Sequence, residues 1–312
     1  MVCTVVLNLF SQISLATKDG VDRLHERQDN RERREEHQAI LDWLTSIDYA
    51  PQQHDFFSRR QEGTGEWLLR STEFQEWINH NKQTLFCPGI PGAGKTMLAS
   101  IIIDYLGDKF QNDGNIGIAY AYCNFRRQRE QTPLKLLTSL LKQLVQGKQS
   151  IPEDVRDLYE SHRRKGKRAS LDEIVRLLYS VLAGCSKSFI LIDALDECQA
   201  VNRSREKLLT ALFDLQDKTG AHVFATSRFN PDVVKKFEGT LTLEIRATVQ
   251  DVRKYLDGQI SRLPSFASRN LGLQEEIKTQ ITKAVDGMYV SLSSSRPRKL
   301  TVVQVPSRPA SS

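Results

Sequence analysis

The chain has 312 residues, with 44 Lys and Arg against 38 Asp and Glu, for a net charge of +6. This length fits one large or two ordinary domains, and a hydrophobic content of 39% is enough for a sizeable core. The basic excess is mild, and a nucleic-acid-binding face would need clustered charges, so we expect no nucleic acid partner.

The first 15 residues are apolar, but the segment is too short to span a bilayer and lacks a basic n-region. We therefore expect neither a membrane span nor a signal peptide. The cysteines are odd in number and form no C-x-x-C pair: Cys3, Cys87, Cys123, Cys185 and Cys198. This usage predicts free buried thiols in a reducing compartment, the cytoplasm or alternatively the nucleus, and neither a disulfide framework nor a zinc site.

Residues 18–37 are dense in charges of alternating sign that nearly cancel. Pairs such as Arg31 and Glu35 have the i,i+4 spacing of neighbours on a helix surface. We predict a solvated helical arm over residues 1–50, and we expect it to bind protein partners, either further copies of the chain or an effector.

Residues 51–82 are predicted to form a lead-in helix and loop. Ser71 is a residue type that caps helix N-termini, and Phe74 and Trp77 follow it at helical spacing. We expect these two aromatic rings to pack in the core.

From residue 83 onward, short apolar segments alternate with helical patterns. The segments assigned to strands are 84–87, 116–124, 188–192, 221–226 and 241–245. Between them, Thr132 precedes a proline in the manner of a helix cap, and Ser170 with Glu173 has the spacing of a capping box. The alternation predicts an α/β domain over residues 83–290, with a mostly parallel five-stranded sheet flanked by helices.

The segment that follows the first strand has the pattern G-x-x-x-x-G-K-T of a phosphate-binding P-loop. Its glycines allow a tight turn with inward N–H groups, and these groups and the next helix N-terminus form an anion site. In this motif the lysine reaches the β- and γ-phosphates, and the threonine hydroxyl binds Mg²⁺. The pattern predicts ATP or ADP with Mg²⁺ as ligands, held by Gly89, Gly92, Ala93, Gly94, Lys95, Thr96 and Met97.

A second apolar strand ends in a carboxylate at Asp193, and Asp196 and Glu197 follow shortly after. Asp193 is predicted to hold Mg²⁺ together with Thr96, largely through water. A further carboxylate has to orient or deprotonate the attacking water. Asp196 and Glu197 are the candidates, and we prefer Glu197.

A third strand, 223–226, runs into the polar residues Ser227 and Arg228. Either of them is a candidate sensor of the γ-phosphate, and an arginine at this place can stabilise charge on the transferring group. A strand also lies between the P-loop and Asp193 in sequence, which suits ATPases with an inserted strand between these two landmarks. No N-K-x-D motif stands where a GTPase would carry it, which favours ATP.

Three sequence stretches together resemble a NACHT-type ATPase: GIPGAGKT, FILIDALDEC with a small residue directly after the aspartate, and FATSRFNP. More closely, RRQEGTGEWLL and EFQEW upstream resemble the nephrocystin-like N-terminal module and NACHT region of fungal ankyrin-repeat proteins. The resemblance covers roughly residues 20–290. It implies a signal-transducing STAND ATPase that exchanges ADP for ATP, opens and oligomerises.

Residue by residue, the resemblance places the P-loop residues on phosphate and Mg²⁺, Asp193 on Mg²⁺, Glu197 or Asp196 on water, and Arg228 as the sensor. The sequence departs from this family at its C-terminus. Residues 291–312 are rich in Ser and Pro, contain no acidic residue, and are predicted to be disordered. We expect a truncated form that lacks the winged-helix and repeat regions of the family.

Two other functions remain open at this stage. One is a nucleotide-binding scaffold with negligible turnover, which steady-state hydrolysis would distinguish from a switch. The other is a P-loop kinase, which the acidic pair after Asp193 and the lack of a recognisable acceptor-binding lid disfavour.

Overall fold

The computed structural model describes residues 25, 27–148, 150–198, 203–259 and 270–293. Most of the predicted start of the arm falls outside these residues, as do residues 294–312 of the tail that was predicted to be disordered. Residues 291–293 of that predicted tail belong to a helix instead. The chain divides into two compact units, of which the first holds residues 1–60 and 65–246 and the second holds residues 61–64 and 247–312. Each unit is described by itself.

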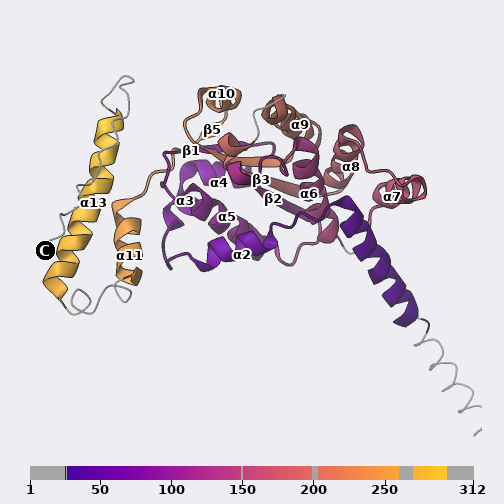
Figure 1. Ribbon diagram of the computed structural model, residues 1–312, viewed down its shortest axis with the longest axis horizontal. Coiled ribbons are helices and arrows are strands. Elements are labelled where there is room, and N and C mark those ends of the chain that lie inside the picture. The colour runs from indigo at the N-terminus through magenta and orange to yellow at the C-terminus, as the bar shows by residue number, and fades with distance from the viewer. Residues whose placement is uncertain (1–24, 26, 149, 199–202, 260–269, 294–312) are drawn as a thin grey trace, which may run out of the picture. The chain divides into compact units, whose positions relative to one another are not determined.

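The first unit is built on a five-stranded sheet in the order β2-β3-β4-β1-β5 (Figure 1). All neighbouring strands are parallel. The strands are β1 (Thr84–Pro88), β2 (Ile116–Tyr122), β3 (Lys187–Asp193), β4 (His222–Ser227) and β5 (Leu241–Thr242). The predicted α/β fold with a parallel five-stranded sheet is confirmed.

Burial explains which segments form the centre of this sheet. Every residue of β1 and β4 is buried, as expected for strands covered on both faces. The fifth strand is shorter than the predicted 241–245, but the chain continues alongside β1 beyond it. The amide of Leu243 donates to Phe86 O at 3.0 Å, and the amide of Ile245 donates to Pro88 O at 2.7 Å.

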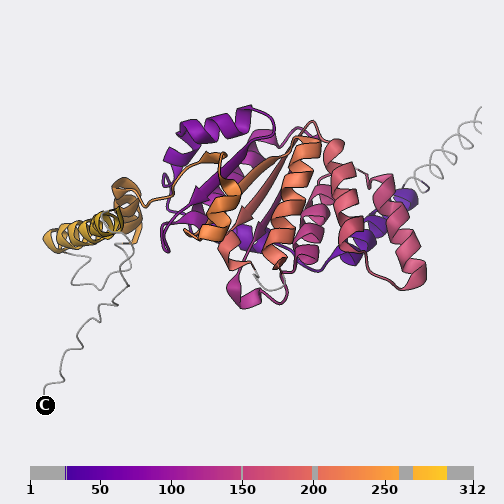
Figure 2. The same cartoon turned by 90° about the horizontal axis from the view of Figure 1, so that it is seen from above.

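The order of the strands decides which helices cover which face. The chain passes from β1 to β2 across β4 and β3, and then returns through β3 and β4 to β5. Because such connections are right-handed, the two directions place their helices on opposite faces. Figure 1 shows α2 and α5 on one side of the sheet and α9 and α10 on the other, and Figure 2 shows the same layers from above. Of these helices, α2 (Ala50–Ser58) precedes β1. The helices that connect strands are α5 (Lys95–Phe110), α6 (Pro133–Gln146), α7 (Glu153–Lys165), α8 (Leu171–Ala183), α9 (Ser204–Thr219) and α10 (Pro231–Val234).

The predicted helix caps are present because their chemistry is local. Thr132 accepts a hydrogen bond from the amide of Lys135 at the start of α6. Ser170 and Glu173 form a reciprocal capping box at the start of α8. Ser71 accepts from the amide of Phe74 at the start of α4 (Thr72–Asn79), which follows the short helix α3 (Glu66–Arg70).

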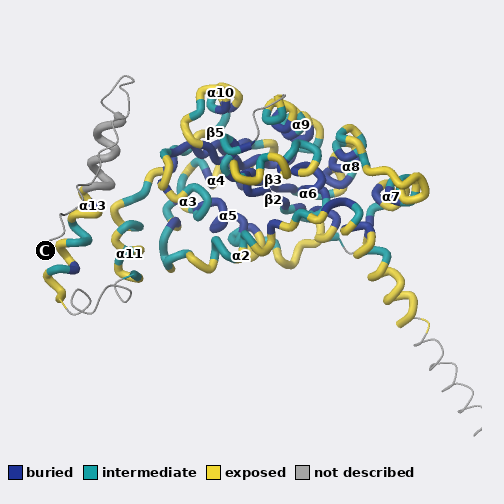
Figure 3. Tube along the Cα trace, in the orientation of Figure 1, coloured by how far each residue is buried: buried dark blue, intermediate teal, exposed yellow. Residues whose placement is uncertain are grey.

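The N-terminal arm is a helix over residues 27–44, and Figure 3 shows its first turns exposed. The predicted pair forms on its surface, with Arg31 Nε 2.8 Å from a carboxylate oxygen of Glu35. Toward its end, Ile40 and Leu44 are buried in the core. The arm is therefore solvated at its start and anchored at its end.

The second unit contains α11 (Val249–Gln259) and α13 (Leu271–Ser293). An ion pair joins these helices, with Lys278 Nζ 2.6 Å from a carboxylate oxygen of Asp257. Lys254 Nζ also donates to Gly63 O at 2.6 Å, which ties residues 61–64 to α11.

At the amino-terminal ends of the strands, His222 is buried in an aromatic cluster. Its ring stacks on Phe189 with centroids 4.7 Å apart, and the edge of Trp77 lies against it. Its Nδ1 lies 2.7 Å from Trp77 O. Burial lowers the pKa of His222 to about 4, against the opposing effect of the hydrogen bond to Trp77.

This burial predicts a pH dependence of stability. In the unfolded chain His222 titrates near its ordinary pKa of about 6.5, so between about pH 6.5 and 4 only the unfolded state binds the proton. The free energy of unfolding should therefore fall as the pH is lowered through this window. Replacing His222→Gln removes the titration and keeps an N–H donor, so the slope should be shallower by up to about 1.4 kcal/mol per pH unit. Urea unfolding of both proteins from pH 7 to pH 4 measures this, and equal slopes would contradict it.

Candidate nucleotide-binding site

The predicted site residues come together at one edge of the sheet. The carboxyl ends of parallel strands meet at the same edge, where ligands of open α/β sheets bind. The P-loop follows β1, Asp193 ends β3, and Arg228 follows β4. The strand predicted between the P-loop and Asp193 in sequence is β2, which lies at the edge of the sheet, and the strand that lies between β1 and β3 in space is β4.

The glycines of the P-loop serve two different purposes. Gly92 and Gly94 have φ angles of +80° and +89°, which favour glycine, and a Cβ on either would meet nothing within 4 Å. Gly89 has no positive φ. A Cβ built on it would lie 2.5 Å from the carbonyl oxygen of Ile245. The expectation that Gly89 serves the tight turn is wrong, because it is close backbone packing that requires this glycine.

Lys95 begins α5 and its side chain lies across the loop. Its ammonium donates to the carbonyls of Gly89 and Ile90, each at 2.8 Å. Partial burial lowers the pKa of Lys95, and the charges of Asp196 and Asp193 oppose this shift. The ammonium is thus a positive charge fixed over the P-loop.

Asp193 is 4% exposed and is held by two hydroxyl groups. Thr96 donates to one carboxylate oxygen at 2.7 Å, and Thr226 donates to the other at 2.6 Å. Burial raises the pKa of Asp193, and these two hydrogen bonds together with the charge of Lys95 oppose the rise. The hydroxyl–carboxylate pair of Thr96 and Asp193 is a donor set that suits Mg²⁺, which prefers hard oxygen ligands.

Thr226 was not predicted as a site residue. Besides holding Asp193, its hydroxyl oxygen accepts a hydrogen bond from the amide of Ala194 at 2.8 Å. Ala194 has a φ of +56°, an uncommon conformation for a residue with a side chain. The small residue directly after Asp193 was the sign of this turn in the sequence. The turn leads into the short helix η2 (Leu195–Glu197), which carries the acidic pair.

A hollow of about 340 Å³ lies over these elements. It is lined by Pro91, Gly92, Gly94, Lys95, Thr96, Met97, Ala194, Asp196, Glu197 and Arg228. Of the predicted site residues, Gly89, Ala93 and Asp193 do not line it. Ala93 is buried, and Asp193 lies behind the hydroxyl of Thr96. The hollow thus joins the glycine turn, a fixed ammonium and two carboxylates.

The two carboxylates after Asp193 differ in their surroundings. Asp196 has a side chain that is 9% exposed. It accepts a hydrogen bond from the amide of Arg228 at 2.9 Å, lies 3.2 Å from Arg228 Nε, and lies 3.3 Å from the hydroxyl of Ser227. These contacts fix Asp196 as an anchor for the segment after β4.

Glu197 has a side chain that is 21% exposed and fewer donors around it. One carboxylate oxygen lies 2.6 Å from Arg228 Nη2, and the other accepts from the amide of Phe125 at 3.2 Å. Gln128 donates to Glu197 O at 3.0 Å. Phe125 and Gln128 belong to the segment after β2, which contains η1 (Phe125–Arg127) and was not predicted to contact the site.

Of the two predicted sensor candidates, only Arg228 faces the hollow. Ser227 is fully buried, and its hydroxyl donates to Arg228 O at 2.7 Å. Arg228 is half exposed and bridges Asp196 and Glu197. The guanidinium therefore lies at the mouth of the hollow, against both acids.

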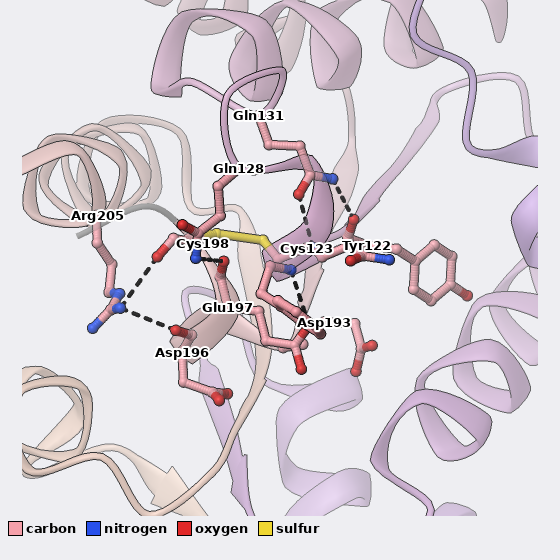
Figure 4. The surroundings of a disulfide bond; sticks show 12 residues. Tyr122, Cys123, Gln128, Gln131, Asp193, Asp196, Glu197, Cys198 and Arg205 are labelled. Atoms are coloured by element: carbon pink, nitrogen blue, oxygen red, sulfur yellow. Dashed lines mark hydrogen bonds between the residues drawn. A yellow bond between two sulfur atoms is a disulfide. The ribbon is translucent and has the colours of Figure 1, made fainter. Parts of the chain in front are cut away.

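The prediction that the thiols are free is wrong for two of them. Figure 4 shows a disulfide between Cys123 and Cys198. Their Cα atoms are 5.5 Å apart. They follow the ends of the neighbouring strands β2 and β3, so the sheet brings them together across 75 residues of sequence. Cys87 and Cys185 are free. Among the described residues there is no cluster of metal-ligating side chains of the kind that zinc needs.

A larger hollow of about 680 Å³ lies near the end of the N-terminal arm. It is lined in part by Trp43, Ile47, Leu134, Arg168 and Ile174. It contains none of the predicted site residues, so its volume alone does not make it the functional site.

These observations define the chain as a P-loop nucleotide-binding domain. The family model described as Nephrocystin 3, N-terminal matches residues 63–228, which is more than half of the sequence. The chain therefore belongs to this family, and the resemblance stated from the sequence motifs is confirmed.

The vegetative incompatibility protein HET-E-1 of Podospora anserina is 25% identical over 241 residues, which are 72% of this chain and 17% of that protein. The chain thus spans about a sixth of the length of this relative.

Solved structures with a similar fold include domain III of the Thermotoga maritima replication initiation protein DnaA. It has a TM-score of 0.39 and 16% identity, over 78% of this chain and 92% of that chain. The Drosophila ORC bound to DNA has a TM-score of 0.43 and 15% identity, over 75% of this chain and 56% of that chain. Similarity at this level says nothing about activity.

Within the part of the chain that the structure describes, no helix has both the length and the apolar character to cross a membrane.

The close approach at Gly89 predicts the effect of one methyl group. Gly89→Ala places a carbon against the carbonyl of Ile245, so it should lower the free energy of unfolding by about 1–3 kcal/mol, the usual range for overpacking. Gly107→Ala is the matched control, because a Cβ there meets nothing within 4 Å on the exposed side of α5. The control should raise stability by about 0.5–1 kcal/mol. Urea unfolding measures both, and a neutral Gly89→Ala would show that the backbone can move apart freely.

Proposed function

We propose that the chain is a regulatory ATPase that binds ATP and ADP with Mg²⁺ and hydrolyses ATP slowly. The observation that carries this proposal is the contact between the Thr96 hydroxyl and the Asp193 carboxylate at 2.7 Å, beneath a hollow lined by the P-loop and the acidic pair. A P-loop and a strand-end aspartate in contact are the two halves of one nucleotide–Mg²⁺ site.

The residues present fit a nucleotide triphosphate. The open space beside Gly92 and Gly94 lets phosphate oxygens approach the backbone, and α5 directs its N-terminus at the same place. Lys95 brings a positive charge to the β- and γ-phosphates. We assign these residues, with the backbone of Ala93 and Met97, to phosphate binding.

Thr96 and Asp193 would hold Mg²⁺, whose role when bound is to neutralise charge on the phosphate oxygens. Asp193 stays in position because Thr96 and Thr226 occupy its two oxygens. Thr226 acts through Asp193 and is a positioning residue.

Glu197 is the preferred general base for the attacking water, and Asp196 is the alternative. Asp196 is surrounded by donors from Ser227 and Arg228 and is nearly buried. Glu197 is more exposed, lines the hollow and has fewer fixed donors. A carboxylate that is less tied up can turn to accept a proton from water.

Arg228 is the proposed sensor of the γ-phosphate. Its guanidinium now bridges both acids, 2.6 Å from Glu197 and 3.2 Å from Asp196. A flexible cation at the mouth of the hollow can exchange these partners for phosphate oxygens, since guanidinium groups bind carboxylate and phosphate by similar geometry. Such an exchange would also release Glu197.

A signalling role is the finer part of the proposal. It is supported by membership of the nephrocystin 3 N-terminal family and by the similarity to a vegetative incompatibility protein. We propose that the exposed N-terminal arm binds protein partners, a second copy of the chain or an effector, and that residues 83–290 act as the nucleotide-dependent core.

A nucleotide-binding scaffold with negligible turnover is the second candidate. One observation favours it: both carboxylate oxygens of Glu197 already accept hydrogen bonds, from Arg228 and from the amide of Phe125. Steady-state phosphate release separates the two functions.

Lys95→Ala tests nucleotide binding. Loss of a charge-assisted interaction worth about 1.5–3 kcal/mol should weaken ATP–Mg²⁺ binding roughly 10- to 150-fold, while the fold remains. Lys109→Ala, at the exposed end of the same helix, is the control and should bind normally. Calorimetry measures both affinities, and thermal melts check the fold. Equal affinity in Lys95→Ala and wild type would refute the P-loop assignment.

Glu197→Gln tests catalysis. The amide preserves size but cannot take up a proton, so turnover should fall by about 10²- to 10⁴-fold, the usual contribution of a positioned base. ATP binding should persist. Asp196→Asn is measured in parallel and should affect turnover less. If only Asp196→Asn abolishes turnover, the two carboxylates exchange roles.

A further inference from the structure

The segment after β2 is joined to the acidic turn at the site by a disulfide. Cys123 directly follows β2, and Cys198 directly follows Glu197. Their sulfur atoms are bonded, so the cross-link is one residue from the proposed base (Figure 4). The disulfide therefore restricts how far the backbone of Glu197 can move.

Hydrogen bonds run beside this disulfide. The amide of Phe125 donates to a carboxylate oxygen of Glu197 at 3.2 Å, and Gln128 donates to Glu197 O at 3.0 Å. The path from Cys123 to the Phe125 amide, across to Glu197 and back through Cys198 is a small closed ring. Closure by a covalent bond keeps the backbone of Glu197 close to the backbone of Phe125 even when the hydrogen bond between them breaks.

The two sides of the ring are held differently. On the β2 side, Gln131 is 3% exposed; it donates to Tyr122 O at 2.7 Å and accepts from the amide of Asn124 at 2.7 Å. Cys123 also donates its amide to Asp193 O at 3.0 Å. This side stays on the sheet without the disulfide.

The acidic turn is held by weaker means. It is a three-residue helix, and Arg205 Nη2 contacts Asp196 O at 3.0 Å and Cys198 O at 3.1 Å. Burial of Leu195 anchors the start of the turn. Beyond it, without the disulfide, Glu197 is held by hydrogen bonds from Arg228, Phe125 and Gln128, each of which contributes little net stability. The turn, with Glu197 on it, is the side that gains freedom when the disulfide is broken.

We propose that Cys123 and Cys198 are redox-sensitive positioning residues for Glu197. The disulfide keeps the carboxylate on the Phe125 amide and Arg228, and reduction lets it turn toward the attacking water. Hydrolysis is then faster in the reduced protein, while nucleotide affinity, set by the P-loop, is unchanged. This inference rests on the proposed ATPase function.

The chemistry is thiol–disulfide exchange with a small disulfide such as glutathione disulfide. One protein thiolate attacks it, forms a mixed disulfide and releases one glutathione. The second protein thiolate attacks the protein sulfur of that mixed disulfide and releases the second glutathione. Two electrons pass to glutathione disulfide, and the hydrogens of the two protein thiols end on two glutathione molecules.

The other described thiols do not compete for this role. Cys87 in β1 has no exposed surface, whereas Cys123 is 6% exposed, and burial raises the pKa of the Cys87 thiol, which keeps it protonated and unreactive. Cys185 is partly exposed and lies 3.3 Å from Lys148 Nζ, away from the residues that line the site. Cys185→Ser is therefore a matched control that removes a thiol without touching Glu197.

The experiment equilibrates the wild-type chain in reduced or oxidised glutathione buffer and measures kcat and KM for ATP with Mg²⁺. ATP affinity is measured by calorimetry in both buffers, and alkylation with mass spectrometry counts the free thiols of Cys123 and Cys198. We expect kcat to be about 2- to 10-fold higher in the reduced protein, the effect of one net hydrogen bond. KM and affinity should stay constant.

Cys198→Ser should lose the redox dependence and keep the reduced kcat in both buffers, whereas Cys185→Ser should retain the dependence. A purely structural disulfide would change the melting temperature, but it would not raise kcat on reduction while leaving the ATP affinity constant. The inference is overturned if the pair stays reduced in the oxidised buffer, or if the oxidised protein hydrolyses ATP as fast as the reduced protein or faster. Absence of turnover or of ATP binding in both buffers would instead contradict the proposed function, on which the inference rests.

Discussion

The buried carboxylate of Asp193 is the constraint on which the site depends. Strand β4 separates β1 from β3, so the P-loop and the acidic strand are not hydrogen-bonded neighbours. Two hydroxyl groups bridge this gap, since Thr96 comes from the helix after β1 and Thr226 from β4 itself. A carboxylate that is 4% exposed needs such partners, because an unpaired buried charge is costly. The hydrogen bonds that satisfy Asp193 therefore also hold together the end of β3, the end of β4 and the start of α5.

Much of this arrangement could be predicted because its signals are local. The P-loop pattern fixes Gly92, Gly94 and Lys95 within a few residues, and the left-handed glycines match it. The caps at Thr132 and Ser170 depend only on the next three residues and are present as predicted. The alternation of apolar segments and helices was enough to predict a parallel five-stranded sheet, but it does not predict the order of the strands.

The rest depends on contacts that no local pattern encodes. Thr226 looked like an ordinary strand residue, and it becomes a site residue only because β4 pairs with β3. The amide of Phe125 reaches Glu197 across 72 positions of sequence. The number and spacing of the cysteines predicted free thiols, because the sequence does not show that β2 pairs with β3. The register of these two strands brings Cys123 and Cys198 together. Pairing between strands therefore decides which side chains meet at the site.

The packing of Gly89 against Ile245 connects the P-loop to the last residues of the first unit. Residues 241–245 run beside β1, and the first unit ends one residue later at Arg246. There is no room for even a methyl group between Gly89 and the carbonyl of Ile245, and closely packed interiors transmit displacement because they compress little. A shift of the loop entrance toward Ile245 must therefore push the last residues of this unit. A displacement at Gly89 is thus passed to the peptide that leads into residues 247–312.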